Sequence, residues 1–311
     1  MTGRKVWKNG EILPESEAVV SVYDSAMLFG DTVFEMCRSF NGKHFKLREH
    51  LERLYRSIKY VRIPLEMTMD EMEDACHEAA KANVFELDDE HRLMINVTRG
   101  LLPIYGETGK PGPNVIISDF PLRWTTAGMG KLFDTGINAV IPSQRQIPAH
   151  LLDPRVKNRS RLHYLMANIE VAQAGGDNNW PLLLDPDGFI AEGTGCNFFM
   201  VKNGIPLSPE GRNTLRGVSR DFIFDMIQYS GEMNITPYDV YDADEAFVAG
   251  TPFCMLPVTS LNGVPIGTGK VGPVFTEILD EWGSRVNMDI REQIQAWDEG
   301  AVEGPSPYKF R

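Results

Sequence analysis

The stretch WPLLLDPDGFIAEGTGCNFFMVKNGIPLSP, residues 180–209, alternates strand-like runs with two turn sequences. Asp-Pro-Asp-Gly at 185–188 and Asn-Gly at 203–204 are typical of tight turns, because these residues tolerate the backbone angles that turns require. The stretch therefore predicts an antiparallel meander. Glu192 is the one acid in residues 188–199, which are otherwise small, apolar or uncharged, so we expect a buried carboxylate that faces a cation or a proton.

The first part of the chain combines short strand-like runs with amphipathic helices. Asn-Gly pairs at 9–10 and 41–42 lie between strand-like runs and predict two hairpins. Apolar residues from Lys46 to Val61 recur at spacings of four, three, four and three, which predicts a helix with one apolar face. The remaining patterns predict a helix over 68–82, a strand over 92–100, a loop rich in Gly and Pro over 101–114 and a strand over 115–120.

A change of pattern between about residues 118 and 130 marks the expected boundary between two domains, 1–123 and 124–311. Short elements of βαβ type precede this boundary, and a block rich in strands follows it. A linker after Pro148 leads into a predicted helix from about Ser160 to Ala174. Beyond the meander we expect a helix over about 218–230, a strand over 245–251 and a last helix over about 272–285.

The composition of the 311 residues is typical of a soluble globular protein, with 42% hydrophobic and 24% charged residues. No apolar run approaches the roughly 18 residues of a membrane-spanning helix, so we expect no membrane insertion. The N-terminal segment MTGRKVWKNG lacks the apolar stretch of a secretory signal, so we expect a cytoplasmic protein. The formal charge of −12 argues against a nucleic-acid partner, because such binding requires a basic surface.

No metal site or common catalytic motif is expected. The four cysteines are scattered and the six histidines show no ligand spacing, so we interpret the cysteines as buried apolar residues and expect no metal ion. The sequence also lacks the Gly-x-Ser-x-Gly motif of serine hydrolases, the common Gly-rich phosphate-binding motifs and His-Glu-x-x-His. Besides Glu192, one lysine and two glycine-containing segments remain as candidates.

Lys157 lies just before a predicted helix and is flanked by Arg155, Arg159 and Arg161. Neighbouring cations and the positive end of a helix both disfavour an ammonium group, so this amine could be neutral near pH 7 and act as a nucleophile. The alternative is a solvated basic patch at the start of a helix.

Two segments place a glycine beside a hydroxyl group. Gly217, Val218 and Ser219 fall at the start of a predicted helix, where backbone N–H groups can hold a phosphate, although Gly-x-Ser is also a common helix cap. Gly250 and Thr251 follow a predicted strand, where close backbone approach and a hydroxyl could serve a ligand. The alternative for the second segment is an ordinary turn.

Several long motifs, in this order, resemble one family: YDSAMLFGDTVFEMCRSFNG, LREHLERLYRSIKYVRI, VKNRSRL, DPDGFIAEGTGCNFFMVKNG, RGVSRD, DEAFVAGTPFCMLPV and GKVGPV. The family is that of the fold-type IV, or class IV, pyridoxal-phosphate aminotransferases, which include branched-chain and D-amino-acid aminotransferases and aminodeoxychorismate lyase. The resemblance covers nearly the whole chain. It implies an α/β (α+β) fold with a small N-terminal α/β domain, a larger strand-rich C-terminal domain, a cofactor cleft between them, and a homodimer that completes each active site.

The resemblance also implies roles for individual residues. Lys157 matches the Schiff-base lysine, which holds pyridoxal 5′-phosphate and shuttles the proton between the substrate Cα and cofactor C4′. Glu192 matches the acid that pairs with the pyridine nitrogen and keeps the ring an electron sink. Arg53 matches the arginine that binds the cofactor phosphate, and the family places three further residues around that phosphate: Val218, Ser219 and Thr251.

Departures from the family patterns bear on the substrate. Leu162 replaces a tyrosine of branched-chain enzymes that bonds the cofactor's phenolic oxygen. Residues 103–106 read Pro-Ile-Tyr-Gly rather than the Pro-Arg-Asn-His of D-amino-acid enzymes, and Glu35 replaces a threonine of the lyase. Phe34 stands where D-amino-acid enzymes have tyrosine, as in the branched-chain group.

We therefore expect transfer from a branched-chain or other hydrophobic L-amino acid to a 2-oxo acid such as 2-oxoglutarate. The alternatives are an aminotransferase for D-amino acids or (R)-amines, since VTRG at 97–100 occurs there too, and, less favoured, the lyase or a cofactor-binding protein without turnover. Phe29 and Phe34 suggest an apolar pocket. The expected substrate-binding residues are Phe34, Arg38, Arg92, Arg99, Gly250 and Pro252.

Overall fold

The computed structural model describes residues 3–85 and 90–298, which divide into two compact units. Unit 1 contains the described residues up to Trp124 together with Val156–Arg161, and unit 2 contains Thr125–Arg155 and the described residues from Leu162 onward. The segment Val156–Arg161, which carries Lys157, thus packs with unit 1, although the sequence placed it in the second domain. The two units are described in turn.

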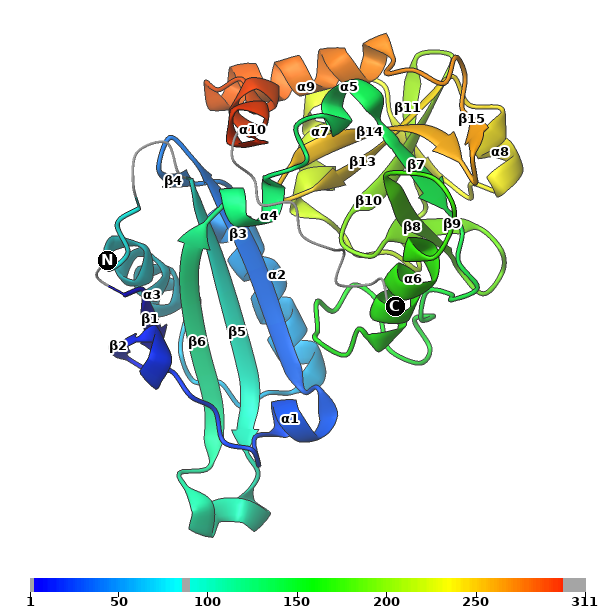
Figure 1. Cartoon of the computed structure of the whole chain (residues 1–311). Helices are drawn as coiled ribbons and strands as arrows, with labels where there is room; N and C mark the ends of the chain where they lie inside the picture. Colours follow the sequence, from blue (N-terminus) through cyan, green and yellow to red (C-terminus); the bar gives the residue numbers. More distant parts are fainter. Residues whose placement is uncertain (1–2, 86–89, 299–311) are drawn as a thin grey trace. The chain divides into compact units, whose positions relative to one another are not determined.

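Unit 1 is built on an antiparallel sheet of six strands in the order β2-β1-β6-β5-β3-β4 (Figure 1). The hairpins predicted at Asn9-Gly10 and Asn41-Gly42 are confirmed, and the asparagine and glycine of both turns have positive φ. The expected βαβ-type pattern is wrong, because each described pairing in this sheet is antiparallel. The strands are β1 (Lys5–Lys8), β2 (Glu11–Pro14), β3 (Thr32–Phe40), β4 (Lys43–His44), β5 (His91–Leu101) and β6 (Gly112–Pro121).

Helices α2 (Leu47–Val61) and α3 (Met69–Lys81) confirm the two predicted helices, and a capping box between Thr68 and Glu71 begins α3. Their apolar faces share one core with alternate residues of β3, β5 and β6, including Val33, Leu93 and Ile117. Both helices therefore cover one face of the sheet (Figure 1). A short helix, α1 (Ser25–Phe29), and a 3₁₀ segment, η2 (Pro103–Thr108), were not predicted.

Unit 2 contains a mixed sheet in the order β12-β11-β10-β13-β14-β7-β8-β9, and an additional pairing of β9 with β10 closes a ring of strands. The predicted meander over residues 180–209 is confirmed, since β8, β9, β10 and β11 pair antiparallel in succession. The strand β14 was missed. The strands are β7 (Ile137–Val140), β8 (Asn179–Leu184), β9 (Ile190–Gly193), β10 (Asn197–Lys202), β11 (Ile205–Pro209), β12 (Gly231–Met233), β13 (Glu245–Gly250), β14 (Cys254–Leu261) and β15 (Val264–Pro265).

The predicted helices of the second half exist with shifted ends. The helix expected from Ser160 begins only at Leu162, because the residues before it pair as extended chain with β3. The helix expected to 230 ends at Met226, after which Ile227 is extended. A further helix follows the one expected to be last. The helices are α4 (Arg123–Thr126), α5 (Leu132–Thr135), α6 (Leu162–Ala172), α7 (Val218–Met226), α8 (Pro237–Tyr241), α9 (Pro273–Val286) and α10 (Ile290–Asp298).

All four cysteines are buried thiols, as expected. Within residues 3–85 and 90–298, no helix has both the length and the apolarity that crossing a membrane requires. In the same residues, no group of three or more His, Cys, Asp or Glu side chains is arranged to hold a metal ion.

Candidate active site

Lys157 lies in an extended segment that pairs with the edge of β3. The Phe34 N–H donates to the Lys157 carbonyl over 3.0 Å, and the Arg159 N–H donates to the Thr32 carbonyl over 2.9 Å. The Lys157 N–H donates to Oγ of Ser57 on α2 over 3.3 Å. The lysine backbone is thus held by a strand and a helix of unit 1. Lys157 precedes a helix, as expected, but α6 begins at Leu162 rather than at about Ser160, so an extended segment separates the lysine from the helix start.

The ring of Phe34 lies among the cations of this segment. Lys157 Nζ is 4.9 Å from the ring centroid, and the guanidinium carbons of Arg159 and Arg161 are 3.6 Å and 5.2 Å from it. Alternate residues of an extended chain point the same way, which explains why these three side chains share one ring. Phe34 is therefore a support for the lysine segment as well as a candidate for substrate contact.

A buried ion-pair cluster surrounds Arg53, the residue expected to bind phosphate. Its Nε and Nη2 donate to the two carboxylate oxygens of Glu35 over 2.6 Å and 2.8 Å, and His50 Nδ1 lies 2.8 Å from Oε2 of Glu35. Burial alone would raise the pKa of Glu35, but the charge and hydrogen bonds of Arg53 hold this pKa well below its ordinary value. Burial also lowers the pKa of His50, so this cluster contains an ionised Glu35 and a neutral imidazole near pH 7.

Arg38 and Arg92 face each other as paired residues of β3 and β5. They lie on the sheet face opposite the one that carries Val33 and Leu93, which α2 and α3 cover. Arg38 Nε donates to the Ser39 carbonyl, and its guanidinium carbon lies 3.9 Å from the centroid of the Phe40 ring.

Arg92 is half-buried and has few compensating groups around its guanidinium. Its Nη2 contacts Sδ of Met36 at 3.5 Å, whereas its buried Nε has no hydrogen-bond partner. Burial, together with the charges of Arg159 and Arg38, lowers the pKa of Arg92 to about 10. No carboxylate pairs with Arg92 among the described residues, so this cation is suited to an incoming anion.

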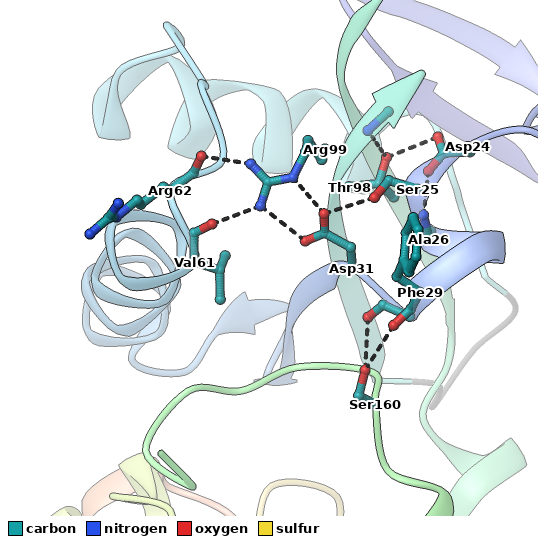
Figure 2. A network of polar contacts seen from close by, with 12 residues as sticks. Asp24, Ser25, Ala26, Phe29, Asp31, Val61, Arg62, Thr98, Arg99 and Ser160 are labelled. Atoms are coloured by element: carbon teal, nitrogen blue, oxygen red, sulfur yellow. Dashed lines mark hydrogen bonds and ion pairs between the residues drawn. The ribbon is translucent and has the colours of Figure 1, made fainter. Parts of the chain in front are cut away.

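Arg99 has a different environment, shown in Figure 2. Its Nε and Nη2 donate to the carboxylate of Asp31 over 2.5 Å and 3.3 Å. Its Nη2 and Nη1 also donate to the carbonyls of Val61 and Arg62 at the end of α2, each over 2.7 Å. The structure therefore separates Arg99 from the pair formed by Arg38 and Arg92, and protein groups already occupy most of its N–H donors.

Glu192 of β9 is buried in unit 2, as its sequence context predicted. Oε1 accepts hydrogen bonds from Gln146 Nε2 over 2.6 Å and from the Tyr164 hydroxyl over 2.8 Å. Oε2 accepts from Asn197 Nδ2 over 3.1 Å and from the Leu215 N–H over 3.0 Å. Because a protonated carboxyl group has less acceptor capacity, four donors favour the ionised form.

Asn197 connects Glu192 to the start of α7. Its Nδ2 also donates to the Leu215 carbonyl over 2.8 Å, and a Cβ added to Gly217 would lie 2.0 Å from its Oδ1. Gly217 is the N-cap of α7 and provides no side-chain cap, so the first N–H groups of the helix, at Val218 and Ser219, keep the anion-binding character expected from the sequence.

The segment Gly250–Pro252 leads out of β13 and into the turn to β14. Gly250 pairs with Cys254 across this turn. A Cβ on Gly250 would lie 2.9 Å from Phe253 Cζ and 3.3 Å from the Gly195 carbonyl, so this position requires glycine for close backbone approach. Asn197 of β10 pairs with Glu192 of β9 on one side and with Ala249 of β13 on the other. The turn at Gly250 therefore follows a strand that is separated from β9 by β10 alone.

Comparison with known proteins identifies the group to which these features belong. The model of the family described as amino-transferase class IV matches residues 32–261, well over half of the chain. A putative branched-chain-amino-acid aminotransferase of Methanocaldococcus jannaschii is 35% identical over 295 residues, which cover 91% of this chain and 99% of the relative. The branched-chain-amino-acid aminotransferase of Salmonella typhimurium is 31% identical, with coverage of 91% and 98%.

The chain belongs to the class IV aminotransferases.

Solved structures of this family agree with the fold. The branched-chain aminotransferase of Escherichia coli matches with a TM-score of 0.80 and 29% identity, over 89% of this chain and 92% of the other. The branched-chain aminotransferase of Thermobaculum terrenum, in its PLP form, matches with a TM-score of 0.80 and 26% identity, over 95% and 97%. The aminotransferase is thus an enzyme of a family that uses pyridoxal phosphate and acts on an amino donor and a 2-oxo acid.

The sequence did not reveal the side chains that hold the candidate residues of this aminotransferase. Tyr164 lies two residues after Leu162, and its hydroxyl binds Glu192, whereas Leu162 is exposed. Gln146 and Glu35 were likewise not assigned a role. The only available signal was chemical, namely polar residues in otherwise apolar segments, because their partners are distant in sequence.

Proposed function

We propose that this aminotransferase binds pyridoxal 5′-phosphate and transfers an amino group between a branched-chain or other hydrophobic L-amino acid and a 2-oxo acid such as 2-oxoglutarate. The observation that carries the proposal is the buried Glu192 carboxylate with its four hydrogen-bond donors. The substrate class is supported by the relatives, which are described as branched-chain aminotransferases.

The residues of unit 2 fit the cofactor. An anionic Glu192 suits a protonated pyridine nitrogen, and the uncapped start of α7 suits a phosphate. When bound, pyridoxal phosphate supplies a ring that withdraws electrons from the substrate α-carbon. Glu192 would keep the ring nitrogen protonated, and the N–H groups of Val218 and Ser219, with Thr251, would hold phosphate oxygens.

In unit 1, Lys157 would hold the cofactor covalently and move the proton at the substrate α-carbon. Its backbone is fixed by Phe34 and Ser57, so its amine starts from a defined position. Arg53 would bind phosphate as a guanidinium whose plane is fixed by Glu35.

For the substrate carboxylate, Arg92 is the first candidate because it lacks a carboxylate partner in the described part of the chain and has a buried, unbonded Nε. Arg38 is its neighbour and the second candidate. Phe34, Gly250 and Pro252 remain candidates for contact with the rest of the substrate. Arg99 has little support as a substrate ligand, since its donors serve Asp31 and the end of α2.

We further propose a homodimer. Val22, Met27 and Phe29 expose apolar side chains around α1, and Ile104 does so on η2. The stacked rings of Tyr23 and Tyr105, 5.2 Å apart, join the two segments into one surface. Sedimentation equilibrium tests this: a monomer at micromolar concentration would contradict it. A cytoplasmic location remains a prediction.

The test of the activity is the absorption spectrum of the bound cofactor during addition of L-leucine, D-alanine, L-glutamate and (R)-1-phenylethylamine, one at a time. We expect L-leucine to convert the cofactor to its amine form faster than D-alanine or the amine. Faster conversion by D-alanine or by (R)-1-phenylethylamine than by either L-amino acid would overturn the proposed stereopreference. No conversion by any donor would favour a binding protein without turnover.

A further inference from the structure

Arg99 lies where three parts of unit 1 meet. As Figure 2 shows, its guanidinium reaches Asp31, just before β3, and two carbonyls, those of Val61 and Arg62, at the C-terminal end of α2. The Arg99 N–H also donates to the Asp31 carbonyl over 3.4 Å. One side chain at the end of β5 thus ties the end of a helix to the start of a strand.

A second layer of hydrogen bonds fixes α1 to the same place. Oδ2 of Asp31 also accepts from Oγ of Ser25 over 2.8 Å. Asp24 caps α1 by accepting from the Ala26 N–H over 2.8 Å, and its other oxygen accepts from the Thr98 hydroxyl over 3.0 Å. Neighbouring residues of β5 therefore hold both ends of the turn that leads into β3.

The lysine segment is attached to these same elements. Oγ of Ser160 donates to the carbonyls of Phe29 and Gly30 over 3.4 Å and 3.2 Å, at the C-terminal end of α1. The Arg159 N–H donates to the carbonyl of Thr32, the residue after Asp31. On the other side, Ser57 of α2 accepts from the Lys157 N–H. Arg99 thus joins the two parts of unit 1 that hold the Lys157 segment, namely the turn from α1 into β3 and helix α2.

We propose that Arg99 is a positioning residue, which acts through Asp31 to fix the corner that holds the Lys157 segment, and that it does not bind the substrate carboxylate. A substrate carboxylate would have to displace Asp31 and detach the guanidinium from α2. This inference rests on the proposed function in so far as it assigns the reacting amine to Lys157.

The test compares Arg99→Ala, Arg99→Lys and Asp31→Asn with Arg56→Ala in the holoenzyme. Arg56 is a matched control, because it is an exposed arginine of α2 whose nearest carboxylate oxygen is 3.7 Å away. Lysine keeps the charge but cannot contact Asp31 and both helix carbonyls with one planar fork. Asparagine keeps the size of Asp31 and removes its charge.

Three quantities are measured. Hydrogen exchange of the Phe34 and Arg159 amides reports the pairing between β3 and the lysine segment without any turnover. The kcat for L-leucine reports the placement of the amine. The Kd of 4-methylvaleric acid, which has a carboxylate and no amino group, reports carboxylate binding alone.

We expect Arg99→Ala and Asp31→Asn to speed exchange at both amides by about tenfold or more and to lower kcat by about 10- to 100-fold, the range for a displaced reacting group. Arg99→Lys should fall between these variants and the wild type, while the Kd of 4-methylvaleric acid stays within about twofold throughout. Arg56→Ala should match the wild type in all three quantities.

The proposal is overturned if Arg99→Ala leaves either the amide exchange or kcat unchanged, or if it raises the Kd of 4-methylvaleric acid tenfold. Should Arg99→Ala fail to fold, the exchange and kcat criteria apply to Asp31→Asn and the Kd criterion applies to Arg99→Lys. Failure of the proposed function is separate: transamination that survives in Lys157→Ala would refute it whatever the Arg99 variants do.

Discussion

The Tyr164 hydroxyl donates a hydrogen bond of 2.8 Å to Oε1 of Glu192, which links helix α6 to strand β9 within unit 2. Gln146 donates to the same oxygen, and its Nε2 also lies 2.8 Å from the Tyr164 hydroxyl. Together with the Asn197 Nδ2 and the Leu215 N–H, which donate to Oε2, these donors hold the carboxylate from both of its oxygens. Its orientation and its charge are therefore both fixed before any ligand binds.

Replacing Tyr164 by Phe removes one of these donors without changing the packing of the ring. A hydrogen bond to a charged group contributes about 1.5–3 kcal/mol, so we expect the half-reaction with L-leucine to slow by roughly 10- to 100-fold. Single-turnover kinetics measures this rate. Tyr229→Phe, at an exposed position, is the control. An unchanged half-reaction in Tyr164→Phe would show that the remaining donors suffice.

Replacing Glu192 by Gln has a larger expected effect than loss of the charge alone. The amide would place an NH₂ group against donors from Tyr164, Gln146 or Asn197, so at least one donor would be left unsatisfied. We expect the proton-transfer step to slow by more than about 100-fold, with a smaller loss in cofactor affinity. The half-reaction rate and the cofactor Kd test this separately. Equal losses in both would argue against a role at the ring nitrogen.

Replacing Lys157 by Ala should abolish covalent attachment of the cofactor and essentially all transamination. The fold should survive, because hydrogen bonds of the Lys157 backbone and of Ser160, which the substitution leaves in place, hold this segment. Borohydride reduction followed by peptide mass spectrometry identifies the attached lysine in the wild type. Lys59→Ala, an exposed residue of α2, should stay fully active. Labelling of a different lysine would refute the assignment.

Local sequence patterns predicted the helices and hairpin turns of unit 1 well. They did not predict the backbone pairings and side-chain hydrogen bonds that hold the candidate residues in place. The periodicity behind α2 and the Asn-Gly turns act over a few residues, and both were correct. The pairing of Asn158 with Val33 joins positions far apart in the chain, and no local pattern reports it. For the same reason the start of the helix after Lys157 was placed too early, and the donors to Glu192 were missed.

Among the expected substrate-binding residues, the candidates for the carboxylate are Arg38, Arg92, the turn at Gly250 and, more weakly, Arg99, and they could not be ranked firmly from their positions alone. Side chains alternate along a strand, so Arg92 and Arg99, seven residues apart, lie on opposite faces of β5. Strand pairing and core packing are needed to show which of the two faces α2 covers. Hydrogen bonding then distinguishes the two arginines, since Arg99 donates to Asp31 and to α2, whereas Nε of Arg92 has no partner. These quantities depend on tertiary packing, which single-sequence patterns do not contain.

Replacing Arg92 by Ala should raise KM for L-leucine by about tenfold or more, because the substrate carboxylate would lose the guanidinium, with its unbonded Nε, that we propose to bind it. The kcat should change less, provided that Lys157 keeps its position. Steady-state kinetics with L-leucine and 2-oxoglutarate measures both constants. Arg123→Ala, which lies outside the paired strands, is the comparison. A KM close to that of the wild type would shift the assignment to Arg38.

The pH dependence of stability should report His44, whose ring lies 6.1 Å from the rings of both His77 and His91. Burial and the charges of those two histidines lower the pKa of His44 to about 4, from an ordinary 6.5, while Glu90 acts in the opposite sense. Between these values the unfolded chain binds a proton that the folded protein excludes. The free energy of unfolding should therefore be highest above pH 6.5 and fall as the pH approaches 4, by at most about 1.4 kcal/mol per pH unit from this group.

In His44→Gln this contribution should vanish, so urea denaturation at pH 7, 5.5 and 4.5 should give a shallower decline than in the wild type. His150→Gln, at an exposed position, should retain the wild-type decline, and an equally steep decline in His44→Gln would mean that His44 does not control the stability in this range.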